Sequence, residues 1–217
     1  MRRISGSEGL HLILNEGIAK IMISDAELQQ AFPREYPKDL DYVGSAKEEL
    51  PYDFDTRIVT EKFKGQRWEN IHADVLQECF DVASWLNHRA FQYFFPAFIK
   101  QSQVDVEKTS LLVDSLISML ADGGVHWPES LKDAEAKLLS ENPEISEAIE
   151  SINKKDLSVW RQERWKLFTE QQWALVRKWL NWINQDERWE VDRDVLRKAV
   201  KNADDWQMKQ AGVPQKW

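Results

Sequence analysis

Two pairs of side chains have the spacing of one half of a di-iron carboxylate site, in which a Glu-x-x-His sequence lies on one face of a helix. The first pair is Glu69 and His72, and the second is Glu8 and His11, with a glycine between its two members. A complete site also needs two further glutamates. A surface pair on a helix explains the same residues. We therefore keep Glu69 and His72 as candidate metal ligands beside that simpler interpretation, and we predict no cofactor.

Two other features suggest chemistry but fit a structural role. Asp133, Glu135 and Lys137 have the spacing found in metal-dependent nucleases, which need the three side chains on one face of a strand. Their lysine- and glutamate-rich surroundings predict a helix, on which the side chains would diverge. Cys79, the only cysteine, lies in an apolar helical pattern, so we expect it in the core rather than as a nucleophile. We assign no catalytic residue.

The sequence also lacks the common motifs for nucleotides and hydrolysis. It contains no glycine-rich phosphate loop, zinc-binding pair or hydrolase nucleophile motif. His88 and Arg89 follow Asn87, a residue type that caps helix N-termini, and together they would suit an anion. Plain capping explains the same three residues. The interpretation therefore leans away from an enzyme.

The elements that would position these residues are predicted to be helices. Glycine is scarce, at eight residues, and few stretches alternate apolar and polar residues. Ser24 and Glu27 form a capping box that starts a helix ending near Phe32, and Thr169–Gln172 form another that starts a helix ending near Asn184. Further helices are expected at about 68–86, 88–95, 106–121 and 192–203. We predict an all-α, single-domain bundle of about seven or eight helices over residues 1–217.

Three segments are expected to interrupt this bundle. Residues 33–66 are polar, acidic and rich in proline and glycine, so we predict a long surface loop with a short extended piece at Thr56–Thr60. Pro96 is expected to interrupt the helix that begins at His88. Residues 128–158 are rich in lysine and glutamate with thin apolar stripes, which predicts a protruding helical hairpin inserted in the domain.

Charge favours a protein partner over nucleic acid. The formal net charge is −8, and residues 25–62 hold ten acidic and five basic residues. Nucleic-acid binding needs a basic patch, whereas an acidic region suits a basic protein partner. The candidate contacts are Glu48, Glu49, Asp53 and Asp55. The alternative is that the acidity serves solubility alone.

Tryptophan is the compositional outlier, with eleven residues in the chain. Core packing, a partner-binding surface and a ligand pocket each explain this richness. Trp206 and Trp217 lie outside the strong apolar stripes and are the candidate surface contacts. Phe94, Phe98 and Trp173 are the candidates for a pocket that takes a small apolar ligand. Arginines beside the tryptophans would instead stack on indole rings.

The segment Tyr93–Ile99 resembles the aromatic-aromatic-Leu-Pro-Ala-Tyr-Leu motif of an uncharacterised bacterial family. Residues 83–87 and 167–172 resemble its flanking patterns, and Phe95 stands where the family has leucine. The resemblance covers roughly residues 18–183. It implies a helical fold and a bacterial cytosolic setting, and it implies no reaction.

These observations lead to one main functional hypothesis. We expect a non-catalytic, cytoplasmic protein-interaction module, such as a toxin-neutralising immunity protein that binds a basic partner. No apolar run approaches the roughly 20 residues that cross a bilayer, so no membrane role is expected. The alternatives are a helical metalloenzyme that uses Glu69 and His72, and a helical domain that binds a small apolar ligand.

Overall fold

A computed structural model describes residues 22–38, 40, 53–121, 137, 140 and 163–212 of the chain. Within these ranges every regular element is a helix, which confirms the prediction of an all-α fold. The elements are α2 (Asp25–Ala31), α3 (Asp53–Phe63), η1 (Trp68–Asn70), α4 (Ala73–Glu78), α5 (Val82–Trp85), α6 (His88–Val104), α7 (Val106–Ala121), α11 (Glu170–Gln185) and α12 (Arg193–Gln210).

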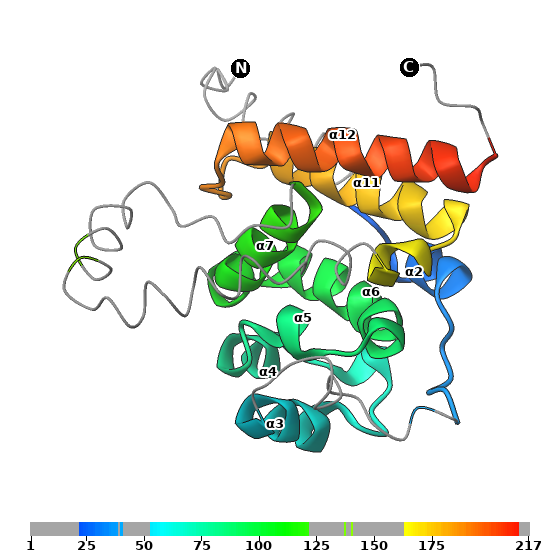
Figure 1. The fold of residues 1–217 in the computed structure, drawn as a ribbon, viewed down its shortest axis with the longest axis vertical. Coiled ribbons are helices and arrows are strands. Elements are labelled where there is room, and N and C mark those ends of the chain that lie inside the picture. Colours follow the sequence, from blue (N-terminus) through cyan, green and yellow to red (C-terminus); the bar gives the residue numbers. More distant parts are fainter. Residues whose placement is uncertain are drawn as a thin grey trace, which may run out of the picture.

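The helices form three tiers around α7 (Figure 1). Helices α11 and α12 lie side by side in one tier, α6 and α7 form the middle tier, and α3, α4 and α5 form the third. Helix α7 packs against α12, α4, α6 and α5, so it touches all three tiers. Helix α2 packs against α11 at one edge. The buried apolar side chains of the described residues join into a single hydrophobic cluster.

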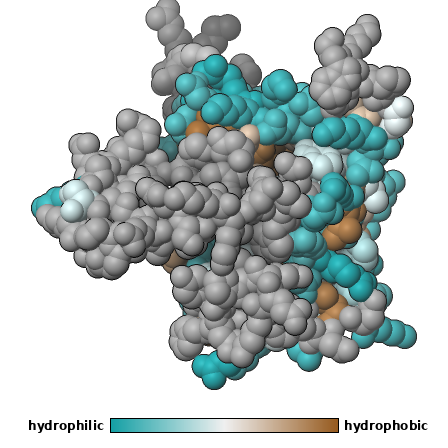
Figure 2. All heavy atoms as spheres, viewed as in Figure 1, coloured by the Kyte–Doolittle hydropathy of each residue, from teal (hydrophilic) through white to brown (hydrophobic). Residues whose placement is uncertain are grey.

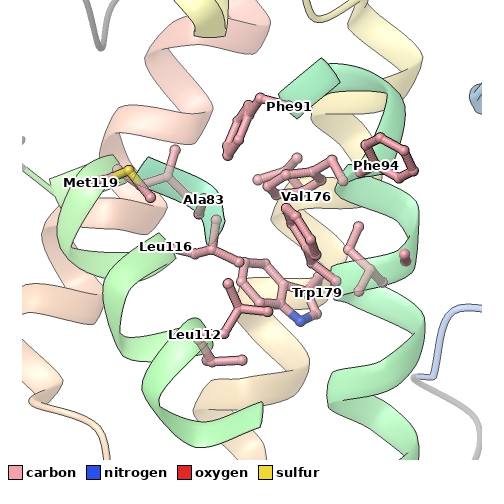
Figure 3. Packing of buried hydrophobic residues seen from close by; sticks show 14 of the residues in the cluster. Ala83, Phe91, Phe94, Leu112, Leu116, Met119, Val176 and Trp179 are labelled. Carbon is pink, nitrogen blue, oxygen red and sulfur yellow. The ribbon is translucent and has the colours of Figure 1, made fainter. Parts of the chain in front are cut away.

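Trp179 lies in the middle of this cluster (Figure 3). Its indole projects from α11 towards α6 and α7, with Leu112 and Leu116 beside it. The ring of Phe95 on α6 meets it edge-on, with 5.9 Å between centroids. Tryptophan carries a large apolar surface, so this one side chain of α11 packs against both α6 and α7.

The predicted helix starts are confirmed by their capping contacts. The Ser24 hydroxyl accepts from the backbone N–H of Glu27, and the Glu27 carboxylate accepts from that of Ser24. Thr169 and Gln172 make the same reciprocal pair at α11. The Asn87 side chain accepts from the N–H of Ala90 at the start of α6. These contacts satisfy backbone donors that have no partner within the helix.

The prediction of one helix over residues 68–86 is wrong. The segment is divided into η1, α4 and α5. Side chains from other elements bind carbonyls at the first break and at the end of α5: Gln101 donates to Ile71 at 2.8 Å, and Arg164 donates to Leu86 at 3.1 Å. Because side chains bind these carbonyls, the backbone can depart from helical hydrogen bonding there at little cost in free energy. The helical spacing of the apolar residues did not reveal the breaks.

Pro96 does not interrupt its helix, contrary to the prediction. Helix α6 continues through it to Val104. Proline removes one backbone hydrogen bond, here to the carbonyl of Gln92, and crowds the preceding turn. Twelve of the 17 residues of α6 are buried. That burial holds the helix together across the proline.

The expected loop 33–66 contains a helix. Helix α3 includes Thr56–Thr60, which we predicted to be extended. Val59 and Phe63 are buried and four residues apart, which is one helical turn. Helix α12 also exceeds its expected end at Ala203 and reaches Gln210. The hairpin expected at 128–158 lies outside the described residues, apart from Lys137 and Ser140, which are helical.

Candidate partner-binding surface

Two acidic side chains of the region 25–62 attach α2 to its neighbours. The Asp25 carboxylate pairs with Lys100 Nζ of α6 at 2.8 Å, and Glu27 pairs with Lys178 Nζ of α11 at 2.7 Å. The hydrogen bond from Lys178, followed by that from the Ser24 N–H, lowers the pKa of Glu27. These two carboxylates therefore have partners within the fold.

Two basic side chains of the same region pair with acids elsewhere. Arg34 Nε lies 3.1 Å from a carboxylate oxygen of Glu69, and Lys62 pairs with Glu78. Among the ion pairs of the described residues, two acids and two bases of residues 25–62 are thus paired with side chains outside this region. The acidic excess of ten acids over five bases is not neutralised by these contacts.

Helix α3 carries two of the candidate acids on a well-anchored element. Asp53 and Asp55 lie in its first turn, where the helix dipole favours negative charge. Phe63 at its other end is fully buried and meets the ring of Phe94 edge-on at 5.0 Å. The structure describes only the backbone of Asp53 and Asp55, while Glu48 and Glu49 lie outside the described residues.

Trp206, predicted to be a surface contact, is half-buried. Its ring stacks on that of Trp173, with 6.0 Å between centroids and 3° between planes. Lys209 Nζ lies 4.7 Å from the centroid of the same indole, as in a cation–π contact. Trp206 therefore packs against the core while part of it meets solvent. Trp217, the other candidate, lies outside the described residues.

The three candidate pocket residues lie in the core. Phe94, Phe98 and Trp173 are all fully buried. Their described ring neighbours are Phe63 and Tyr93 for Phe94, Phe91 and Phe95 for Phe98, and Trp165, Phe168 and Trp206 for Trp173. These neighbours all belong to the one hydrophobic cluster, so the described contacts of the three candidates are those of core packing.

Glu69 and His72 do not share a helical face, contrary to the prediction. Glu69 lies on η1, whereas His72 is the N-cap residue of α4 and is exposed. The Glu69 carboxylate accepts hydrogen bonds from Arg34 and Arg67, each 3.1 Å at its shortest. The carboxylate that was proposed as a metal ligand is thus already paired with two guanidinium groups. Among the described residues, no three His, Cys, Asp or Glu side chains are grouped as metal ligands.

The remaining sequence candidates divide between the core and the undescribed segments. Cys79 is 5% exposed, and burial raises the pKa of its thiol, as expected of a core cysteine. His88 is the first residue of α6, directly after the Asn87 cap. Glu8, His11, Asp133 and Glu135 lie outside the described residues.

Sequence reasoning missed the buried position of Arg164. Its side chain is fully buried, and it donates to the carbonyls of Ala83 and Leu86 at the end of α5. The guanidinium lies 4.4 Å from the ring centroid of Phe91, so it stacks on a phenylalanine rather than an indole. Stacking on an indole ring was the expectation for arginines beside tryptophans, whereas no local pattern indicated the bonds to the Ala83 and Leu86 carbonyls.

A second missed residue is Asp114 on α7. Its side chain is half-buried, and burial raises its pKa from 3.8 to about 6. Desolvation disfavours the charged form of a carboxyl, which accounts for the direction of the change. The sequence pattern of α7 gave no sign that this aspartate is shielded from water.

The described surface in one view is mainly hydrophilic, with small separate hydrophobic areas (Figure 2). Six large apolar side chains are exposed among the described residues: Met22, Phe80, Val104, Leu111, Leu167 and Met208. Because the hydrophobic areas in this view are small, we take charge rather than apolar character as the guide to a binding surface. No described helix has both the length and the apolar character needed to cross a bilayer.

Comparison with known proteins found no family model, curated protein or solved structure that matches this chain.

Proposed function

We propose that this chain is a non-catalytic protein-interaction module that binds a basic protein partner through the acidic region 25–62. The observation that carries the proposal is the acidic excess of this region, which the described ion pairs leave unchanged. An acidic surface accelerates association with a basic partner and disfavours acidic ones.

Two further observations support this surface. Helix α2 is attached to α6 and α11 by ion pairs, and α3 is anchored through Val59 and Phe63, so Asp53 and Asp55 belong to a helix that is attached to the core. Preorganised charges lose little entropy when a partner binds. The candidate contacts remain Glu48, Glu49, Asp53 and Asp55.

Toxin neutralisation in a bacterial cytoplasm is the setting that we propose for this activity. Immunity proteins are small binding modules that act without chemistry of their own, and an acidic surface suits a basic toxin domain. The bacterial setting derives from the resemblance of Tyr93–Ile99 to the uncharacterised family. In the structure this segment is buried along α6, which agrees with a packing role for the motif.

The test is reversal of four charges in the full chain. Lysine replaces Glu48, Glu49, Asp53 and Asp55, and the variant is compared with wild type as bait for proteins of the native host. The control carries lysine at four exposed acids elsewhere, Glu107, Glu170, Glu187 and Asp194. Three of these lie in the first turns of helices, as Asp53 and Asp55 do.

We expect a basic protein to be retained by wild type and by the control, and to be lost from the variant in the acidic region. Its association rate should also fall as salt is added. Retention by all three baits, or equal loss from both variants, would refute the proposed binding surface.

A further inference from the structure

Residues 22–36, here named the strap, attach to three parts of the fold. Helix α2, within the strap, packs against α11, and the chain that follows it runs along one edge of the molecule (Figure 1). Ile23 is bonded to α6, and Arg34 pairs with Glu69 of η1. The strap therefore spans elements that are distant in sequence.

Most of the strap's long-range hydrogen bonds are made to its backbone. Gln103 of α6 accepts from the N–H of Ile23 at 2.7 Å and donates to the carbonyl of the same residue at 3.0 Å. Further donors to strap carbonyls are Gln172 to Ala31 at 3.0 Å, Trp68 to Pro33 at 2.9 Å and Tyr93 to Arg34 at 3.2 Å. Side chains of the rest of the fold thus bind the strap much as a groove binds a peptide.

The strap has a smaller share of the core than the helices beneath it. Of the seven residues of α2, only Leu28 is buried, whereas twelve of the 17 residues of α6 are buried. Ile23 and Phe32 add two buried side chains outside the helix. The ion pairs of Asp25 and Glu27 are partly exposed, so salt screens them. Segments with few buried contacts open at a lower free energy than the core.

We propose that the strap opens from the fold as one unit, ahead of global unfolding, with Gln103 as its main attachment. Opening separates Phe32 from Phe168, whose rings meet at 6.2 Å. It also frees Lys100 and Lys178 from Asp25 and Glu27. The surface uncovered is apolar and positively charged, unlike the acidic region that covers it.

Amide hydrogen exchange of the full chain, followed residue by residue by NMR, tests the proposal. The reporters are the amides of Ile23, Leu28 and Phe32, which bond to Gln103 Oε1, the Ser24 carbonyl and the Leu28 carbonyl. The variant is Gln103→Ala. The control is Gln101→Ala, because Gln101 is also a buried glutamine of α6 but binds Ile71, outside the strap.

In wild type we expect the three reporters to exchange at one shared opening equilibrium, faster than the amides of α7. Gln103→Ala should accelerate all three together by about tenfold, since two buried hydrogen bonds are lost. Gln101→Ala should leave them unchanged. High salt should accelerate them in wild type while the α7 amides keep their rates.

Two results would overturn the proposal. In the first, the reporters do not share an equilibrium, and Gln103→Ala accelerates the exchange of the Ile23 amide alone. Alternatively, wild-type reporters exchange as slowly as the α7 amides at low and high salt, which means that the strap opens only in global unfolding. The salt comparison in wild type decides the question even where Gln103→Ala fails to fold.

Discussion

The indole N–H of Trp179 on α11 donates to the hydroxyl of Ser102 on α6 at 2.9 Å, and the bond is buried. The Ser102 hydroxyl in turn donates to the carbonyl of Ile99 at 2.7 Å. A largely apolar interface between two helices thus contains a short polar chain, which fixes how the central tryptophan is oriented. Buried polar groups of this kind are costly to leave without a partner.

Replacing Ser102 with alanine removes the acceptor of the Trp179 N–H. We expect the free energy of unfolding to fall by about 1–3 kcal/mol, measured by urea denaturation. Ser110→Ala is the control, because Ser110 also donates to a carbonyl three residues earlier but is not bonded to a tryptophan. Its effect should stay within about 0.5 kcal/mol. Equal losses in the two variants would contradict a special role for the Trp179 bond.

Replacing Arg164 with lysine keeps the charge but removes the planar fork that reaches Ala83 and Leu86. One buried carbonyl then lacks its donor, so we expect a loss of about 2 kcal/mol in urea denaturation. Arg193→Lys is the control, since Arg193 is exposed and also bonds a helix-end carbonyl, that of Asn184. Similar stability of the two variants would show that the fork of Arg164 is dispensable.

Asp114→Asn should stabilise the protein at neutral pH. The pKa of Asp114 in the folded chain, about 6, lies above its ordinary value of 3.8, so its ionised form is disfavoured by folding. This cost is fully present above pH 6 and disappears as the pH falls towards 3.8. Because solvent contact reduces the effect, we expect a gain of about 1–2 kcal/mol at pH 7.

Urea denaturation at pH 7 and at about pH 4 measures this pH dependence. The gain from Asp114→Asn should be present at the higher pH and nearly absent at the lower one. Glu61→Gln on the exposed face of α3 is the control, with little effect expected at either pH. A gain from Asp114→Asn that is the same at both pH values would indicate a cause other than ionisation.

Trp206→Ala removes the ring that stacks on Trp173. We expect a loss of about 2 kcal/mol and a weaker near-ultraviolet circular dichroism signal, while Trp206→Phe should retain part of both. Met208→Ala on the same helix is the control, because Met208 is 40% exposed. If Trp206→Ala were as stable as Met208→Ala, the packing role of Trp206 would be excluded.

Cys79 should react slowly with an aromatic disulfide reagent in the folded protein. The thiol is buried and its pKa is raised, so thiolate and reagent rarely meet. We expect labelling at least about tenfold slower than in denaturant. A Cys79→Ala, Glu107→Cys variant carries a surface thiol for comparison. Labelling of native Cys79 as fast as this surface thiol would contradict its burial.

The sequence predictions are accurate where the interacting residues are close in sequence, and they fail where those residues are far apart in sequence. Capping boxes at Ser24 and Thr169 were predicted because their partners are three residues away. The break after Asn70 and the end of α5 at Trp85 are bonded by Gln101 and Arg164, whose bonds span 30 and 78 residues. No local pattern contains that information, so the apolar spacing alone favoured one long helix.

The candidate surface shows the same limit. The acidic excess of residues 25–62 is a property of composition and was visible in the sequence. The pairings that leave this excess unchanged are tertiary contacts, such as Glu27 with Lys178, 151 residues away. Likewise, the half-burial of Trp206 results from Trp173 on another helix. The predictions for Glu48, Glu49 and Trp217 concern residues outside the described ranges.

The order of the helices along the chain has a consequence for synthesis on the ribosome. Helix α6 has twelve buried residues, and the rings that cover Phe91 and Phe95 belong to Trp165, Phe168 and Trp179. Trp165, Phe168 and Trp179 are all translated after α7 is complete. A nascent chain arrested before Trp165 therefore presents Phe91 and Phe95 without these rings, which leaves the kind of apolar surface that chaperones bind and that aggregates when they do not.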